Sequence, residues 1–201
     1  MKLTLIRHTS LQIAAGICYG QSDVDVAHSF FDEVETLKTK LNTKHSHTTL
    51  NAKHFDAIYS SPLQRCTKLA IALQSSLNVD SHTVHEHLKE LDFGDWELQA
   101  WDDISRDIFD VWAKDYASLA PPNGETFSQL QQRGLQFLTQ MQTKHAGEHI
   151  VVITHGGMIR ALIANVLNME LKGLFRITID YASMTQLDFS QAVPKINFVN
   201  L

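Results

Sequence analysis

Two histidines and two arginines are the residues of this chain whose types could do chemistry on an anion. They are Arg7, His8, Arg65 and His155. The planar guanidinium group of an arginine matches the oxygens of a phosphate, so the two arginines predict a phosphate-binding site. Because neighbouring cations disfavour the imidazolium form, His8 would be neutral and nucleophilic near pH 7. His155 would donate a hydrogen bond to the phosphoryl oxygens as charge develops on them.

Three apolar runs predict the strands that would bring these four residues together. The runs are Lys2–Ile6, Phe55–Tyr59 and Ile150–Thr154. Arg7 and His8 directly follow the first run, and His155 directly follows the last. Arg65 lies one turn into the helix expected after the run Phe55–Tyr59. Ligands of open α/β sheets bind beyond the carboxyl ends of the strands, and a helical side chain leans back toward the start of its helix. We therefore expect all four side chains at one edge of the sheet.

Helices are expected between these strands, and further strands after them. The helix with Arg65 would have Ser61 as its N-cap and Pro62 at its first position, and would run to about Leu77. Other helices are expected at Phe30–Leu41, Ile104–Leu119, Gly124–Gln142 and Met158–Leu167, and strands at Arg176–Ile179, Met184–Phe189 and Ile196–Val199. Strands that alternate with helices predict an α/β fold, a three-layer sandwich with a mainly parallel central sheet flanked by helices. The chain has no internal repeat or linker, so residues 1–201 are expected to form a single domain.

The composition is that of an ordinary globular protein and limits the partners. Hydrophobic residues make up 44% and charged residues 19% of the chain. The net charge is −5 and there is no basic run, which argues against a nucleic-acid partner. No run approaches the ~18 apolar residues of a membrane span, and the first apolar stretch is too short for a signal peptide. Cys18 and Cys66 form no CxxC motif, so a reducing, cytoplasmic location is expected.

Histidine pairs and tryptophans leave other interpretations open. The pairs of HxH type are His45 with His47 and His85 with His87. Such pairs can ligate zinc, but neither has a third ligand at a familiar spacing, so no metal site is expected. The tryptophans are Trp96, Trp101 and Trp112. They could line a pocket for a flat base, but packing in or over the core is the expectation. The pocket alternative stays most open for Trp96.

Five short motifs are shared with a known family. They are LIRHT, SSPLQRC, ELDFGDWE, PPNGET and THGG, and they span Lys2 to about Arg160. Together and in this order they resemble the histidine phosphatase superfamily, whose fold is phosphoglycerate-mutase-like. The resemblance implies a metal-independent hydrolase of phosphate monoesters that forms a phosphohistidine. It implies no cofactor, and the expected partner is a small phosphorylated metabolite, bound by a monomer or a homodimer.

The resemblance also assigns roles. His8 matches the nucleophile, Arg7 and Arg65 match the phosphate-binding arginines, His155 matches the second histidine, and Glu90 matches the proton donor. Substrate contacts are further expected from Thr9, Gln21 and Gly156. The acid must protonate the leaving oxygen and then serve as the base for water. Other carboxylates near Glu90 stay open as alternatives, namely Glu86, Asp92, Asp95 and Glu97.

A finer resemblance is to the α-ribazole phosphatase branch, which acts on α-ribazole 5′-phosphate in assembly of the cobalamin nucleotide loop. It depends on the string RHTSLQIAAGICYGQSDV and on ELDFGDWE. The chain departs from the family pattern at Thr9 and Leu98, where glycine is usual. Thr9 narrows the backbone conformations beside the nucleophile, and Leu98 would give the loop after Glu90 another path.

Three other functions remain open. A broad-specificity phosphatase would use the same residues on many esters. A phosphoglycerate mutase would return the phosphoryl group to substrate instead of water, although the chain is shorter than typical mutases of this family. A non-catalytic protein that binds phosphorylated ligands is the third, and the presence of all five matched residues argues against it.

Overall fold

The core of the fold is a six-stranded mixed sheet. The computed structural model describes residues 1–42, 55–80 and 82–201. The strands are β1 (Lys2–Arg7), β2 (Ala57–Ser60), β3 (His82–Val84), β4 (His149–Thr154), β5 (Met184–Asp188) and β6 (Lys195–Phe198), in the spatial order β3-β2-β4-β1-β5-β6. The neighbours β3, β2, β4 and β1 pair in parallel. At the other edge β5 pairs antiparallel with β1, and β6 pairs antiparallel with β5. The predicted mainly parallel α/β sheet is therefore confirmed.

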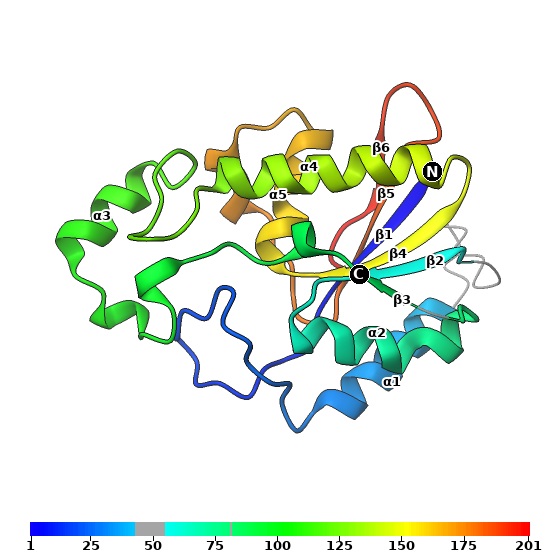
Figure 1. The fold of residues 1–201 in the computed structure, drawn as a ribbon, viewed down its shortest axis with the longest axis horizontal. Coiled ribbons are helices and arrows are strands. Elements are labelled where there is room, and N and C mark those ends of the chain that lie inside the picture. Colours follow the sequence, from blue (N-terminus) through cyan, green and yellow to red (C-terminus); the bar gives the residue numbers. More distant parts are fainter. Residues whose placement is uncertain (43–54, 81) are drawn as a thin grey trace.

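Helices cover both faces of the sheet, as Figure 1 shows. On one face lie α1 (Phe30–Asn42) and α2 (Gln64–Leu77), and on the other lie α4 (Phe127–Lys144) and α5 (Gly156–Val166). Away from the sheet lies α3 (Arg106–Lys114), and the short 3₁₀ helices are η1 (Glu86–Leu88), η2 (Gly94–Trp96), η3 (Trp101–Asp103) and η4 (Leu171–Arg176). The arrangement is the predicted three-layer sandwich.

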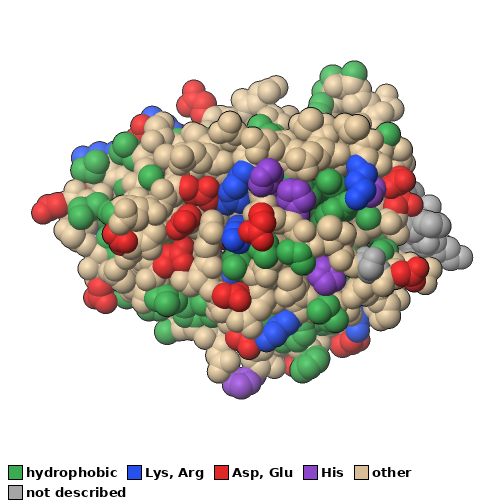
Figure 2. All heavy atoms as spheres, in the orientation of Figure 1, with side chains coloured by type: hydrophobic (Ala, Val, Ile, Leu, Met, Phe, Trp, Pro, Cys, Tyr) green, Lys and Arg blue, Asp and Glu red, His purple; other side chains and the backbone are tan. Residues whose placement is uncertain are grey.

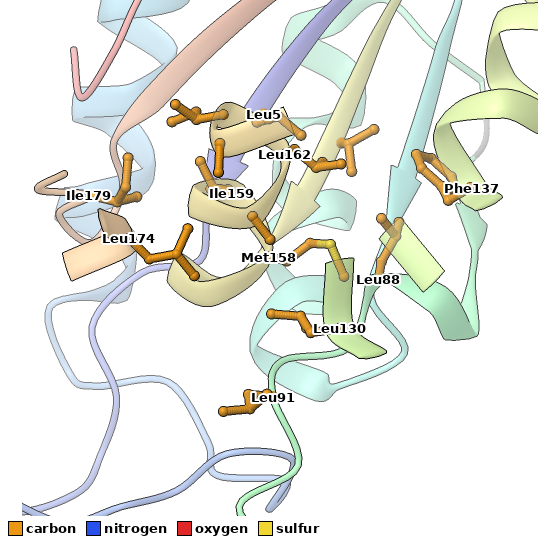
Figure 3. Packing of buried hydrophobic residues seen from close by; sticks show 14 of the residues in the cluster. Leu5, Leu88, Leu91, Leu130, Phe137, Met158, Ile159, Leu162, Leu174 and Ile179 are labelled. Carbon is orange, nitrogen blue, oxygen red and sulfur yellow. The ribbon is translucent and has the colours of Figure 1, made fainter. Parts of the chain in front are cut away.

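The core on the α4–α5 side fixes the position of α5 against the sheet. Met158, Ile159 and Leu162 of α5 are fully buried and belong to one cluster with Leu5 of β1 and Phe137 of α4, and Ile159 lies on the side of Leu174 and Ile179 (Figure 3). Burial of one such side chain stabilises the fold by about 1.5–3 kcal/mol. Because α5 directly follows His155, this packing also fixes the end of β4.

The start of α2 differs from the prediction. The helix begins at Gln64 with Leu63 as its N-cap, and no side chain of the cap residue bonds to it. Asp23, from the loop after β1, instead accepts from the backbone N–H of Gln64 at 2.7 Å. Ser61 bonds elsewhere, as described below. A residue distant in sequence therefore does the capping that a local serine was expected to do.

Two other expected elements were wrong in type or extent. Residues 176–179 were expected as a strand, but Arg176 ends η4 and the residues after it form no strand. Their carbonyls bind arginines instead: Ile177 O accepts from Arg160 Nε at 2.7 Å and Ile179 O from Arg7 Nη1 at 2.6 Å. The helix expected over 104–119 is shorter, because α3 ends at Lys114.

The start of α4 and the strand β3 were also missed. Thr126 and Gln129 form a capping box, so α4 begins three residues later than expected. Strand β3 has only three residues, too few for a visible alternation. None of the helices in the described ranges is long and apolar enough to cross a membrane.

Candidate active site

Neighbouring strand ends bring the sequence-predicted residues together. In the β1–β4 pair Arg7 lies opposite Thr154, so the histidines that follow these two residues become neighbours. The rings of His8 and His155 have centroids 5.1 Å apart. Arg65 reaches the same point from α2, where its Nε lies 3.3 Å from Nδ1 of His155. The two strands and one helix thus place four functional side chains at the carboxyl edge of the sheet.

His8 is buried and held in one tautomer. Its Nδ1 lies 2.8 Å from the carbonyl oxygen of Thr9, and because a carbonyl only accepts, Nδ1 carries the hydrogen. In the neutral ring the lone pair is then on Nε2. Burial, followed by the charges of Arg65 and Arg7, holds the pKa of His8 well below its usual value. The ring is therefore uncharged at neutral pH, with an unprotonated Nε2.

His155 is neutral for the same reasons but has the opposite tautomer. Arg65 Nε donates to its Nδ1, so the hydrogen is on Nε2, which donates to Ser61 Oγ at 2.8 Å. Burial lowers the pKa of His155 well below its usual value, and the charge of Arg65 adds to this effect. Cys66 lies beneath the ring, with its Sγ 3.6 Å from Nε2.

Arg65 is fully buried, and backbone carbonyls hold its guanidinium group. Nη2 donates to Gly20 O at 2.6 Å, and Nη1 donates to Ser22 O at 2.7 Å. Glu97 holds this loop in turn, because its carboxylate accepts from the backbone N–H groups of Gln21 and Ser22 at 2.7 and 2.6 Å. The loop after β1 and the segment after η1 therefore position Arg65 jointly.

Arg7 lies at the entrance to the site. Its Nη1 donates to Ile179 O, and its Nη2 donates to the hydroxyl of Tyr19 at 3.3 Å. Tyr181 stacks on the guanidinium, with Arg7 Cζ 3.8 Å from the ring centroid. The two tyrosine hydroxyls are 3.0 Å apart, and both rings also pack against His8. Nε of Arg7 is buried and has no hydrogen-bond partner within the described ranges.

Glu90 accepts hydrogen bonds at the start of α5. Its Oε2 accepts from the backbone N–H of Gly157 at 3.0 Å, and its Oε1 accepts from the N–H of Leu91 at 2.9 Å. An N–H group at a helix N-terminus attracts a negative charge, so this position suits a carboxylate. A Cβ on Gly157 would overlap with Oε1 of Glu90, so a larger residue there would displace the carboxylate from this position.

A cavity of about 210 Å³ opens beside these groups. Its polar end includes Arg7, Glu90 and Gly156. Its apolar wall consists of Ile17, Phe93, Trp101, Phe127 and Phe175. His8 is behind this surface and is only 1% exposed. The cavity has room for a small organic group next to Arg7.

The expected substrate-binding residues lie in different environments. Gly156 lines the cavity at the start of α5. Gln21 is a scaffold residue, since its Nε2 donates to the carbonyl of Glu90 at 3.0 Å. Thr9 is buried, and its Oγ1 has no hydrogen-bond partner within the described residues. It has a negative φ, so its backbone does not need glycine, whereas Leu98 has a φ of 64°, which glycine adopts readily.

Of the three tryptophans, one contributes to the cavity. Trp101 is part of the apolar wall, whereas Trp96 and Trp112 are only 4% and 7% exposed and belong to the core. The expected core packing is therefore confirmed for Trp96 and Trp112, and Trp101 is the tryptophan that reaches the cavity. Tyr19, Tyr181 and Arg160 of the site were not singled out at all. Tyr19 lies within the quoted string GICYGQSDV, but no local pattern distinguishes the other two.

The HxH pairs do not form a metal site in the described part of the chain. The pair His45 and His47 lies outside the described residues. The rings of His85 and His87 are 5.0 Å apart, and His85 Nε2 lies 3.3 Å from Oε1 of Gln140. On the face that Figure 2 shows, histidine side chains lie beside basic and acidic ones over η1 and α4. Within the described ranges, no group of three or more His, Cys, Asp or Glu side chains could hold a metal ion.

Comparisons with known proteins identify the family. The model of the histidine phosphatase superfamily (branch 1) matches residues 3–201, so the chain belongs to this superfamily. The adenosylcobalamin/α-ribazole phosphatase of Salmonella typhimurium is 24% identical over 204 residues, which cover all of this chain and 96% of that protein. The metal-independent phosphoserine phosphatase of Arabidopsis thaliana is 25% identical over 170 residues, or 82% of this chain and 68% of that protein.

A solved structure supports the fold assignment. The α-ribazole phosphatase from Shigella flexneri superposes with a TM-score of 0.85 at 24% identity, over all of this chain and 96% of that one. The expected phosphoglycerate-mutase-like fold is therefore confirmed. The expectation of a phosphatase-type hydrolase is confirmed at the level of the family.

Proposed function

We propose that the chain hydrolyses small phosphate monoesters through a phosphohistidine on His8. The observation that carries this proposal is the state of His8, a neutral ring whose Nε2 has a free lone pair and whose neighbours are two arginines. A neutral imidazole in a cationic pocket combines a nucleophile with electrostatic stabilisation of the phosphoryl group that it attacks.

In the first step, Nε2 of His8 attacks phosphorus and the ester P–O bond breaks. The Glu90 carboxyl group gives its proton to the departing alcohol oxygen. Arg7 and Arg65 balance the charge on the phosphoryl oxygens through their guanidinium N–H groups. In the second step, water attacks phosphorus and gives a proton to the Glu90 carboxylate, the P–N bond breaks, and its electron pair returns to Nε2.

Two local rearrangements accompany substrate binding in this scheme. His155 now donates its Nε2–H to Ser61, and it would transfer this hydrogen bond to a phosphoryl oxygen. Tyr181 packs on His8 and Arg7 but is 36% exposed, so its ring can swing away and admit the phosphate to Nε2. Both changes exchange one hydrogen bond or stacking contact for a contact with the substrate.

For the alcohol portion we propose α-ribazole, released from α-ribazole 5′-phosphate. The quoted string RHTSLQIAAGICYGQSDV supports this choice, as does the relative from Salmonella that covers the whole chain. The apolar wall of the cavity, with Phe93 and Trp101, offers a surface on which a flat base could stack. The ribose would then lie between this wall and the arginines.

Phosphate release from a panel of esters tests both levels of the proposal. The panel contains α-ribazole 5′-phosphate, a nucleoside monophosphate, ribose 5-phosphate, 3-phosphoglycerate and p-nitrophenyl phosphate, each with EDTA present. We expect turnover that EDTA does not reduce and a kcat/KM highest for α-ribazole 5′-phosphate. His8→Asn should abolish turnover while His28→Asn, on a loop outside the cavity, leaves it unchanged. Substantial turnover by His8→Asn would refute the nucleophile, and equal rates on all esters would refute the choice of α-ribazole.

A further inference from the structure

Arg160 is a cationic side chain of the cavity whose terminal nitrogens are unused. It lies on the first turns of α5, and it lines the cavity with Arg7 and Glu90. Its Nε donates to the carbonyl of Ile177 at 2.7 Å. Neither Nη nitrogen has a hydrogen bond or an ion pair to any residue that the structure describes. The guanidinium group is therefore anchored by one edge, and its other edge is available to a ligand.

Arg160 lies between the polar end of the cavity, near Arg7 and Gly156, and its apolar wall, near Phe175. An ideal Cβ built on Gly156 would be 3.0 Å from Nη1 of Arg160 and 3.5 Å from Nε of Arg7, so both guanidinium groups approach the same point. On its other side, Cζ of Arg160 lies 5.9 Å from the ring centroid of Phe175. A ligand atom that Arg160 contacts would therefore lie between Arg7 and the apolar wall, where the alcohol portion of a phosphate ester bound at Arg7 would begin.

The electrostatics of Arg160 favour a ligand. Burial lowers the pKa of Arg160, and the positive charge of Arg7 lowers it further, whereas Glu90 partly opposes both effects. Glu90 is already bound to two backbone N–H groups and makes no ion pair with Arg160 within the described ranges. Neither Nη atom of Arg160 is among the buried polar atoms that lack a partner, so both can be hydrated in the free protein, and a ligand that displaces this water must offer an acceptor. An oxygen acceptor on the substrate would restore those hydrogen bonds.

A purely structural role does not require these Nη groups. The bond from Nε to Ile177 O holds the segment that leads to Ile179, whose carbonyl in turn orients Arg7. That bond uses one of the five N–H donors of the side chain. The four remaining donors form no hydrogen bond with any residue that the structure describes, although Arg160 lines the cavity.

We propose that Arg160 determines substrate specificity by donating hydrogen bonds from its Nη groups to an oxygen acceptor on the leaving alcohol. The acceptor is a hydroxyl or a carboxylate oxygen a few bonds from the ester oxygen. In α-ribazole 5′-phosphate the ribose hydroxyls would supply it. This inference rests on the proposed phosphatase function and extends it to the recognition of the leaving group.

Three esters that differ in the leaving group test the inference. Phenyl phosphate has no acceptor beyond the ester oxygen, ribose 5-phosphate has hydroxyls, and O-phospho-L-serine has a carboxylate. Arg160→Met removes the donors and keeps the apolar stem, and the exposed Arg176→Met is the matched control. We expect Arg160→Met to lower kcat/KM by ~10–100-fold for one or both acceptor-bearing esters and by less than ~3-fold for phenyl phosphate. The ester with the larger loss identifies the acceptor as hydroxyl or carboxylate.

The other outcomes separate failure of this inference from failure of the proposed function. An equal loss on all three esters, phenyl phosphate included, would make Arg160 a phosphate ligand or a structural residue and overturn the inference. No loss on any ester would overturn it as well. If the unmodified protein hydrolyses none of the three esters or the earlier panel, the proposed function fails first. Thermal unfolding of Arg160→Met beside Arg176→Met shows whether an equal loss is due to structural damage.

Discussion

Lowering the pH from 7.5 to 5.5 should destabilise the protein, because two buried histidines are neutral in the native state. His8 and His155 are 1% and 0% exposed, and burial is the main cause that lowers the pKa of each. In the unfolded chain both would titrate near the ordinary value of about 6.5. Below that pH the unfolded state takes up protons that the native state cannot. The stabilising contribution is thus present above about pH 6.5 and is lost as the pH falls.

The size of the loss follows from this linkage. For one histidine that stays neutral when native, the change from pH 7.5 to 5.5 lowers the free energy of unfolding by about 1.4 kcal/mol, and for two by about 2.7 kcal/mol. That is a large share of the ~5–15 kcal/mol of a typical domain. His149, whose pKa burial lowers to about 4, adds to the loss in the same pH range.

Urea unfolding followed by the fluorescence of the three tryptophans measures this effect. To isolate one histidine, we would compare the unmodified protein with His155→Gln, whose side chain does not titrate. The variant will be less stable at both pH values, but it should lose about 1.4 kcal/mol less than the unmodified protein between pH 7.5 and 5.5. His149 contributes equally to both proteins. An identical pH dependence in the two proteins would refute the assignment of a neutral, buried His155.

Three further substitutions test individual contacts of the site. Glu97→Gln should lower the free energy of unfolding, measured in urea, by about 2 kcal/mol and should also lower kcat. The reason is that an amide cannot accept all the hydrogen bonds that hold the loop to which Arg65 is bound. An unchanged kcat would contradict the link between this loop and the position of Arg65. Leu98→Gly should raise the melting temperature relative to Leu98→Ala, because only glycine relieves a left-handed φ that costs about 1 kcal/mol. Gly157→Ala should displace Glu90 and lower kcat by at least ~10-fold for ribose 5-phosphate, but much less for p-nitrophenyl phosphate, whose leaving group needs little acid catalysis. Equal losses on both esters would argue against Glu90 as the acid.

The strands that carry the site could be predicted from the sequence, because their side chains are buried on both faces. Such strands appear as continuous apolar runs, and each run ends where a polar residue faces the active site. This holds for β1 and β4, whose buried residues pair in register and whose last residues lead to His8 and His155. The sequence predicted that both strand ends lie at one edge of the sheet, whereas the direct neighbourhood of β1 and β4, which brings the two histidines into contact, is a finding of the structure.

What could not be predicted depends on hydrogen bonds between distant parts of the chain. The alternating pattern around Ile177 and Ile179 predicted a strand, but a pattern of side chains does not reveal the partner of a carbonyl. Those two carbonyls accept from Arg160 and Arg7. In the same way, Ser61 had the residue type and position of an N-cap, yet its hydroxyl accepts from His155. Both errors occur at the site, where tertiary contacts override local preference.

The same carbonyls explain how a chain with a net charge of −5 could hold the anion that the proposed function requires. Each arginine of the site is oriented by backbone oxygens: Arg7 by Ile179, Arg65 by the loop after β1, and Arg160 by Ile177. A carbonyl dipole fixes the direction of a guanidinium without neutralising its charge, whereas a carboxylate would cancel it. Within the described ranges none of the three forms an ion pair, in contrast to Arg133 outside the site, which pairs with Glu125. The positive charge therefore stays available: it adds to the effect of burial in keeping His8 neutral, and it would attract the phosphate of the proposed substrate.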